Sequence, residues 1–413
     1  MSATNQPLTS VSHADDVPTI EHPSIPQTWV LDGAITIRPA LVDSDATPIR
    51  VGFLSDMPYG GGAVGFLDPI ILAFEDAMRE GRLGRPIEII ASHALGLPAG
   101  KAENVIAAFR DLVDRGCVIV LSTGVTNNAL VLRDVINECR VPYITMAGTT
   151  RFTGEFCFTL ANGGHGEEAA ILASYLADQR FLRVVLTGES TEGDAEYKAF
   201  FNEQASLYGI EIVDTYYFSN DPSDDEVDAV LERFRALEPD ALAYCGFGIN
   251  SKQLGHSLQR IGWDPPRAMN AAIMWAWGGG EWAEALDGWV GIEQANEPHD
   301  DVEKNVNYVA MHDRFEKRFG VRRDGAMAAL LYDQGRAAAE GIINGPTDDG
   351  VGIAAGLERI KLMPSTIGGP RTFISYGPED HRGYRGDFMF MKQLRNGSFH
   401  FASYHWPQWP VNR

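Results

Sequence analysis

Several features that would point to common functions are scarce or missing in this chain. Its 413 residues include 34 lysines and arginines against 56 aspartates and glutamates, which gives a formal net charge of −22. A field of that sign repels nucleic-acid phosphates and anionic lipid headgroups. No apolar run approaches the roughly 18 residues of a transmembrane span. We therefore expect no nucleic-acid partner and no direct membrane insertion.

Cysteine is also scarce, and the chain lacks the spacings typical of metal sites and hydrolases. Its four cysteines, Cys117, Cys139, Cys157 and Cys245, form no CxxC pair, so neither a zinc knuckle nor a thioredoxin motif is indicated. No GxSxG elbow occurs, and the histidines and acids show no metal-ligand spacing. We expect buried free thiols and neither a metal nor a cofactor.

The first 48 residues lack the features of a secretory leader. No lysine or arginine precedes Arg38, and the longest early apolar run is 29–31, so the basic and hydrophobic parts of a signal peptide are missing. This segment is rich in Ser, Thr, Asp and Pro, and we predict a polar N-terminal extension. The sequence as given indicates a cytoplasmic protein. A periplasmic or extracytoplasmic location would apply if a leader were missing.

From residue 49 the chain alternates between β-rich runs and segments with helical spacing. The predicted strands are 50–54, 86–91, 118–121 and 142–146, and then 183–187, 210–218, 241–244 and 266–270. The alternation restarts after the glycine-rich break at 162–164. Such βαβ repeats predict parallel sheets with right-handed crossovers. The predicted fold class is therefore α/β, with two Rossmann-like lobes.

The last third of the chain has no sheet of its own. Long helices are predicted over 302–319 and 326–343, followed by short β-like runs and a hairpin turn at Asn396-Gly397. These elements must complete the earlier sheets, so the chain must cross between the lobes more than once. We predict that 49–161 and 291–364 form lobe 1, and that 162–290 and 365–413 form lobe 2. A multi-crossover hinge of this kind favours a cleft that closes on a ligand.

Four stretches carry a resemblance to a known family. They are RVGFLSDMP at 50–58, VLSTGVTNNA at 120–129, PYITMAGTT at 142–150 and STIGGP at 365–370. In this order they resemble the type I periplasmic binding proteins, in the Leu/Ile/Val-binding-like branch that serves ABC importers of branched-chain amino acids and amides. The resemblance covers roughly 49–405. It implies a non-catalytic Venus-flytrap protein that captures a small molecule and has a membrane permease as partner, or alternatively a cytoplasmic sensor similar to the amide sensor.

The resemblance also implies a ligand site. Ser122 and Thr123 would hold a carboxylate or carbonyl, with backbone groups of Gly148 and the hydroxyl of Thr150 nearby. This is physically reasonable because the turn leads into a helix whose N-terminal amides favour an acceptor, although the same residues can serve only as helix caps. The candidate ligand contacts of the first lobe are Met57, Tyr59, Phe66, Ser122, Thr123, Gly148, Thr149 and Thr150. Those of the second lobe are Glu192, Phe247, Ala272, Trp275 and Trp277.

Two departures from the family bear on the identity of the ligand. Relatives that bind α-amino acids place acidic residues where this chain reads Ala-Asn-Gly-Gly at 161–164 and Ala-Ala-Ile at 271–273. A buried ammonium without a counter-charge is costly, so we expect a ligand other than a free α-amino acid. The aromatic residues near 275 suggest an apolar or aromatic ligand body, or only packing within lobe 2. Glu167-Glu168 is interpreted as charge that complements a helix dipole, and Glu192 can equally be a solvated carboxylate.

A dinucleotide-binding enzyme is the main rival hypothesis. Gly60, Gly62 and Gly65 match GxGxxG after a strand and before a helix. However, the first glycine lies six positions after Leu54, and no acid follows the second strand to bind a ribose. We therefore favour a solute-binding protein over an NAD-dependent enzyme. The sequence does not indicate an oligomeric state.

Overall fold

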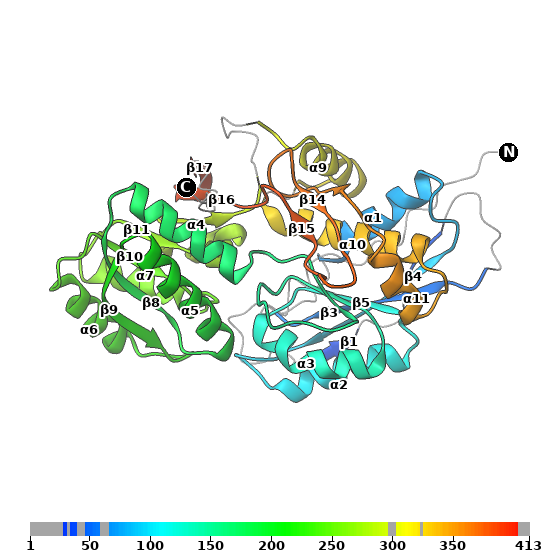
Figure 1. Cartoon of the computed structure of the whole chain (residues 1–413), viewed down its shortest axis with the longest axis horizontal. Coiled ribbons are helices and arrows are strands. Elements are labelled where there is room, and N and C mark those ends of the chain that lie inside the picture. Colours follow the sequence, from blue (N-terminus) through cyan, green and yellow to red (C-terminus); the bar gives the residue numbers. More distant parts are fainter. Residues whose placement is uncertain are drawn as a thin grey trace.

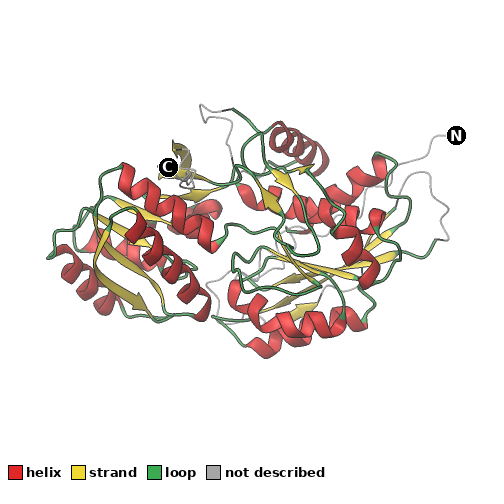
Figure 2. Ribbon diagram, viewed as in Figure 1, coloured by secondary structure: helices red, strands yellow, loops and turns green. Residues whose placement is uncertain are grey.

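The protein consists of two α/β lobes that lie side by side, as shown in Figures 1 and 2. The computed structural model describes residues 28–30, 34–38, 46–57, 66–295, 303–322 and 325–403. Each lobe is built around its own seven-stranded sheet, and a small three-stranded sheet accompanies the first. The predicted fold class, two α/β lobes with largely parallel sheets, is confirmed.

The sheet of lobe 1 has the strand order β1-β4-β3-β5-β6-β7, with β2 also paired to β4. Its strands are β1 (Thr28–Val30), β2 (Ile35–Ile37), β3 (Ile49–Ser55), β4 (Ile87–Ala94), β5 (Ile119–Ser122), β6 (Tyr143–Thr145) and β7 (Cys157–Thr159). The five from β3 to β7 run parallel. The helices that connect them are α1 (Leu67–Arg79), α2 (Ala102–Asp114) and α3 (Thr126–Cys139).

The sheet of lobe 2 has the order β17-β16-β12-β11-β10-β8-β9. Its strands are β8 (Arg183–Glu189), β9 (Glu211–Phe218), β10 (Ala241–Tyr244), β11 (Arg267–Met269), β12 (Val290–Glu293), β16 (Phe390–Arg395) and β17 (Ser398–Ser403). Helices α4 (His165–Asp178) and α5 (Glu192–Leu207) pack on one face. The other face is covered by α6 (Asp224–Arg235), α7 (Ser251–Arg260), the 3-10 helix η2 (Ala271–Gly278) and α8 (Gly280–Ala285).

The chain then returns to lobe 1. Helices α9 (Val306–Phe319), α10 (Ala326–Asn344) and α11 (Gly350–Leu357) precede the short strands β13 (Met363–Pro364), β14 (Phe373–Ile374) and β15 (Tyr384–Arg385). Helix α10 buries 14 of its 19 residues. Its many small side chains explain this, since they let α1 approach closely: a Cβ added at Gly335 would lie 2.8 Å from the Cβ of Ala73.

Two segments lie elsewhere than the sequence predicted. Part of the predicted N-terminal extension is not a tail, because β1 and β2 pair antiparallel with β4. The lobe boundaries also differ: β12 belongs to the second sheet, while β13 to β15 pack on the core of lobe 1. The later crossings therefore follow β12 and β15 rather than falling at 290/291 and 364/365. The hairpin turn is as predicted, with positive φ at both Asn396 and Gly397.

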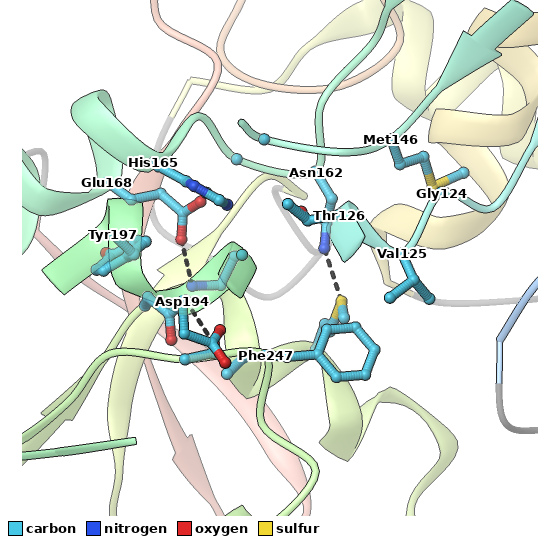
Figure 3. A pocket seen from close by; sticks show the side chains of 18 of the residues that line it. Gly124, Val125, Thr126, Met146, Asn162, His165, Glu168, Asp194, Tyr197 and Phe247 are labelled. Atoms are coloured by element: carbon cyan, nitrogen blue, oxygen red, sulfur yellow. Dashed lines mark hydrogen bonds between the residues drawn. The ribbon is translucent and has the colours of Figure 1, made fainter. Parts of the chain in front are cut away.

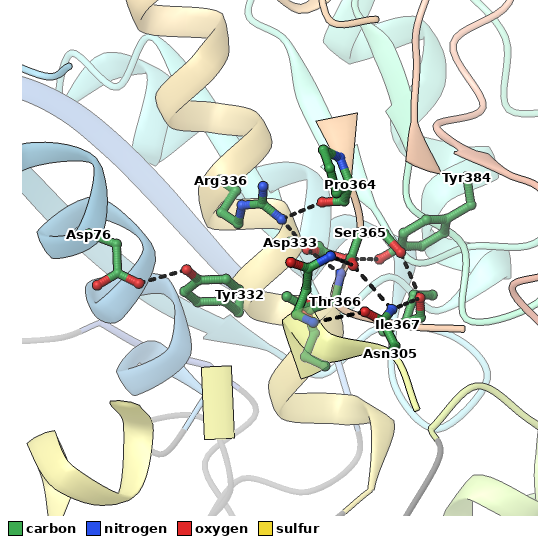
Figure 4. Close-up of polar contacts among 12 residues, drawn as sticks. Asp76, Asn305, Tyr332, Asp333, Arg336, Pro364, Ser365, Thr366, Ile367 and Tyr384 are labelled. Atoms are coloured by element: carbon green, nitrogen blue, oxygen red, sulfur yellow. Dashed lines mark hydrogen bonds and ion pairs between the residues drawn. The ribbon is translucent and has the colours of Figure 1, made fainter. Parts of the chain in front are cut away.

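A buried carboxylate connects α10 to the loop between β13 and β14 and to β15 (Figure 4). Asp333 is fully buried and accepts hydrogen bonds from the Thr366 backbone N–H at 2.9 Å and the Tyr384 hydroxyl at 3.3 Å. Arg336 forms an ion pair with it at 3.3 Å. Burial raises the pKa of Asp333, and the charge of Arg336 opposes that rise. These donors compensate for the loss of water around the carboxylate.

We expect Asp333→Ala to lower the free energy of unfolding by about 3 kcal/mol or more, because it leaves several buried donors unpaired. Denaturant unfolding followed by circular dichroism measures the change. Asp348→Ala is the control, since Asp348 forms an exposed ion pair with Arg85, and such pairs contribute about 0–1 kcal/mol. Equal losses in the two variants would contradict a special role for Asp333.

Candidate ligand-binding cleft

A cavity of about 80 Å³ lies between the two lobes. Lobe 1 lines it with Met57, Thr123, Gly124, Val125, Thr126, Asn127, Met146, Gly148 and Met327. Lobe 2 lines it with Asn162, Gly163, His165, Glu168, Gly193, Asp194, Tyr197, Gly246, Phe247, Asn270, Ala271, Ala272 and Met274. In Figure 3 the side chains of His165, Glu168, Tyr197 and Asp194 lie on one side of this space, opposite Thr126 and Val125.

The strand order explains why the cavity forms here. In lobe 1, β3 has β4 on one side and β5 on the other, and in lobe 2, β8 lies between β9 and β10. At each such point the loops after neighbouring strands diverge and leave a crevice at the carboxyl ends of the strands. Asp56 follows β3 and Thr123 follows β5, while Glu189 ends β8. The two crevices face each other across the cavity.

Five of the residues predicted from the sequence line the cavity: Met57, Thr123, Gly148, Phe247 and Ala272. Ser122 and Thr149 are buried beside it instead. The Ser122 hydroxyl accepts a hydrogen bond from the Gly124 N–H at 3.0 Å. It stabilises the turn and does not cap α3, whose N-cap is Val125. Phe66 packs against the core of lobe 1. Tyr59 and the GxGxxG glycines lie outside the described residues.

Thr150 and Glu192 lie at the rim, where they join the lobes. Thr150 bonds to Glu196 of α5 through its hydroxyl and through its backbone N–H at 3.1 Å. Glu192 forms an ion pair with Arg151 at 2.7 Å. Deeper in, the Gly193 N–H donates to the amide oxygen of Asn127 at 2.7 Å. These contacts connect α3 and the loop after β6 to the first turns of α5, so the lobes are closed on each other.

The two predicted tryptophans do not line the cavity. Trp275 donates its indole N–H to the Phe247 carbonyl at 2.8 Å and stacks on Trp282 with 4.7 Å between ring centroids. It therefore supports the loop that carries Phe247. Trp277 packs against the cores of both lobes, near Gly325 at the start of α10. Of the predicted aromatic wall in lobe 2, Phe247 alone faces the cavity.

The expectation that no acidic side chain faces the ligand is wrong. Glu168 and Asp194 line the cavity and are 3% and 6% exposed. Both come from the first turns of helices, α4 and α5. The sequence argument considered only the loops at 161–164 and 271–273 and interpreted Glu168 as helix-dipole charge. The argument against a free amino acid therefore loses the premise on which it was based.

Both carboxyl groups hold protons more tightly than usual. Burial raises the pKa of Glu168 to about 8, although its carboxylate accepts a 2.7 Å hydrogen bond from the Ala271 N–H. Burial and the nearby charge of Glu189 raise the pKa of Asp194 to about 7. Glu196 at the rim is different: burial alone would raise its pKa, but hydrogen bonds from His165 and two threonines lower it to about 2.

Two α/β lobes that close over a cavity at the carboxyl ends of their strands define a ligand-binding protein of the Venus-flytrap type. A sequence profile of the periplasmic binding protein family matches residues 48–398. The chain therefore belongs to that family and is a solute-binding protein.

Solved structures share the fold at low sequence identity. A type 1 periplasmic binding protein from Bordetella pertussis Tohama I matches with a TM-score of 0.72 and 19% identity, covering 86% of this chain and 100% of that one. An ABC transporter substrate-binding protein from Desulfitobacterium hafniense, in complex with Leu, matches with a TM-score of 0.68 and 16% identity over the same shares.

A third structure has a different ligand. It is an ABC transporter solute-binding protein from Rhodopseudomonas palustris BisB5 in complex with 3,4-dihydroxybenzoic acid, with a TM-score of 0.66 and 21% identity, covering 85% of this chain and 95% of that one. No curated protein matches the sequence. Among the residues described, no helix combines the length and apolarity needed to span a membrane, and no three His, Cys, Asp or Glu residues are grouped as metal ligands.

The pKa of Glu168 makes the stability of the unliganded protein depend on pH. The folded state retains a proton that the unfolded chain releases near its ordinary pKa of 4.5, so stability falls as pH rises from about 4.5 to 8. Glu168→Gln mimics the protonated form. We expect it to match the wild type at pH 5 and to exceed it at pH 9 by on the order of 3 kcal/mol.

Thermal unfolding across this pH range measures the difference. Glu167→Gln is the matched control, because Glu167 is more exposed and pairs with Arg382 at 3.4 Å. A constant difference between Glu168→Gln and the wild type at every pH would contradict the proton held by Glu168.

The rim ion pair should bias the lobes toward closure. We expect Arg151→Glu, which places like charges together, to favour opening and to increase the radius of gyration measured by X-ray scattering. Exposed pairs contribute up to about 1 kcal/mol, which corresponds to about a fivefold change in the ratio of open to closed forms. The exchange Arg151→Glu with Glu192→Arg should restore the wild-type radius. An unchanged radius in the single variant would show that the pair does not stabilise closure.

Proposed function

We propose that this protein is the solute-binding component of an ABC-type importer and captures a small organic ligand between its lobes. The observation that carries the proposal is the cavity between the lobes, which has polar groups from both lobes and apolar side chains between them. Such a site binds by closure, and the closed form is what a partner permease would recognise. The structural relatives described as ABC transporter proteins support this assignment.

The lobe 1 side of the cavity suits an uncharged accepting oxygen of the ligand, such as a carbonyl. Thr126 begins α3 and lines the cavity. Within the described residues no hydrogen bond engages its hydroxyl, and first-turn N–H groups have no partner within their own helix. The helix dipole adds to the attraction for an acceptor.

The lobe 2 side suits a hydrogen-bond donor of the ligand. Glu168 and Asp194 present carboxyl oxygens there, and the Tyr197 hydroxyl is buried without a hydrogen-bond partner among the described residues. An amine, amide or hydroxyl group can donate to such oxygens.

Between these ends the wall is apolar. Met57, Met146, Met274 and Met327 line it with Phe247. Methionine side chains are flexible and polarisable, so they adapt to different apolar bodies.

We expect a thermal-shift screen of small amino acids, amides, amines and aromatic acids to find compounds that raise the Tm by about 5 °C or more. Thr126→Val should weaken binding of the best compound at least about threefold, because it removes one hydrogen bond. Isothermal titration calorimetry measures the affinity. Thr215→Val, on the exposed side of β9, is the matched control and should bind normally. A panel without any stabilising compound would count against solute capture, and equal affinities for both variants would move the acceptor site elsewhere.

A further inference from the structure

The carboxylate of Asp56 occupies the place in lobe 1 where the fold would bind an anion. It is 1% exposed and accepts hydrogen bonds from the Val125 N–H at 2.9 Å, the Thr123 hydroxyl at 2.8 Å and the Asn128 amide at 3.1 Å. Thr123 and Val125 also line the cavity. The donors beside the ligand space are therefore already engaged by an internal acid.

In lobe 2 the carboxylate of Glu189 occupies the corresponding position. It is fully buried and accepts hydrogen bonds from the N–H groups of Gly248 and Asn250, each at 3.1 Å, and from the Tyr244 hydroxyl. The site is closely fitted, because a side chain at Gly246 would overlap the Glu189 carboxylate. Gly248 and Asn250 lie between β10 and α7, just as Thr123 and Val125 lie between β5 and α3.

The loop between a parallel strand and the next helix is the place where α/β folds hold anions, since unpaired N–H groups and the helix dipole converge there. Each lobe has such a loop beside the cleft, and in each loop a carboxylate of the protein, Asp56 or Glu189, accepts the N–H hydrogen bonds. A ligand carboxylate that approaches Thr123 and Val125 finds these two donors occupied, whatever the protonation state of Asp56. It would also approach a second acid within a few ångströms, which is unfavourable at low dielectric.

Buried Lys198 is close enough to Glu189 and Asp194 for its charge to act on them, but it does not line the cavity. Within the described residues, neither a lysine nor an arginine lines the cavity, whereas Glu168 and Asp194 do. Buried Lys198 donates to the Glu189 carbonyl and lies over the Tyr217 ring, so it is engaged behind the wall. His165, the remaining basic side chain at the cavity, is held by Glu196 at 2.9 Å.

We propose that Asp56 and Glu189 are specificity-determining residues that exclude free carboxylates, so that the cleft selects uncharged or cationic solutes such as carboxamides and amines. This inference rests on the proposed solute-binding function and narrows its ligand class. The resemblance had assigned Ser122 and Thr123 to a carboxylate or carbonyl of the ligand. In the structure, the Thr123 hydroxyl donates its hydrogen bond to Asp56 instead. A free amino acid is again excluded, but because of its carboxylate rather than its ammonium group.

Matched ligand pairs test the selection directly. Leucine is compared with leucinamide, and 3,4-dihydroxybenzoate with 3,4-dihydroxybenzamide, by calorimetry at pH 7. We expect the amide of at least one pair to bind 10-fold or more tightly than its acid. Equal or tighter binding of the acids would overturn the exclusion and leave solute capture standing. If no compound of these pairs or of the wider screen binds, the proposed function itself fails.

The second test needs no physiological ligand. Asp56→Ala vacates the position beside the cavity and leaves its three donors unpaired, so the Tm should fall. Sodium acetate should then raise the Tm of this variant by about 3 °C or more relative to sodium chloride at equal ionic strength, with no such effect on the wild type. Asp333→Ala is the control, because Asp333 is buried away from the cavity. Absence of an acetate effect, or the same effect in Asp333→Ala, would contradict an anion position at the cleft.

Asp56→Asn covers the case in which the alanine variant does not fold. It keeps the shape of the side chain and removes its charge, and its amide group can no longer accept from every donor. The preference for amide over acid within a matched pair should then shrink at least about threefold. An unchanged preference would show that Asp56 does not set the selectivity.

Discussion

Burial of carboxylates among helix-initiating N–H groups is the interaction on which this cleft depends. Moving a carboxylate out of water costs several kcal/mol unless donors replace the water. Asp56 and Glu189 obtain those donors from the turns before α3 and α7. In doing so they fix the loops after β5 and β10, which in turn carry Thr123 and Phe247 to the cavity. The acids thus shape the walls of the site and set its charge.

The closed arrangement follows from where the lobes touch. Helix α5 begins at the cleft, and its first turns supply Glu192, Gly193 and Glu196 to partners in lobe 1. On the hinge side, the Gln294 side-chain amide donates to the Ala161 carbonyl at 3.1 Å, and the Gln294 backbone carbonyl accepts from the Gly368 N–H at 2.7 Å. Gln294, which follows β12, thereby contacts both the segment before α4 and the segment after β13. Closure at the rim and cohesion at the hinge therefore involve separate sets of contacts.

Much of the fold was predictable because the local spacing of apolar residues indicates the strands and helices. Apolar runs such as 118–121 and the helical spacing around Phe109 identified the βαβ order, and Asn396-Gly397 identified a hairpin. The acids of the cleft were not predictable in the same way. Asp56 acts on residues about 70 positions away, and Glu168 reaches the cavity only because α4 follows a lobe crossing. Strands β1 and β2 were missed because their pairing with β4 is a tertiary preference that three-residue segments do not reveal.

These two N-terminal strands have a consequence for the solution behaviour of the protein. A sheet that ended at β4 would present a row of unpaired backbone donors and acceptors, which is a template for another chain. The register pairs residues 35–37 with 87–89 and residues 28–30 with 92–94, so the outer edge of β4 is covered along most of its length. A shortened version beginning at β3 would keep the cleft intact but expose a surface suited to intermolecular association. Strands β1 and β2 thus protect this sheet edge from pairing with another chain.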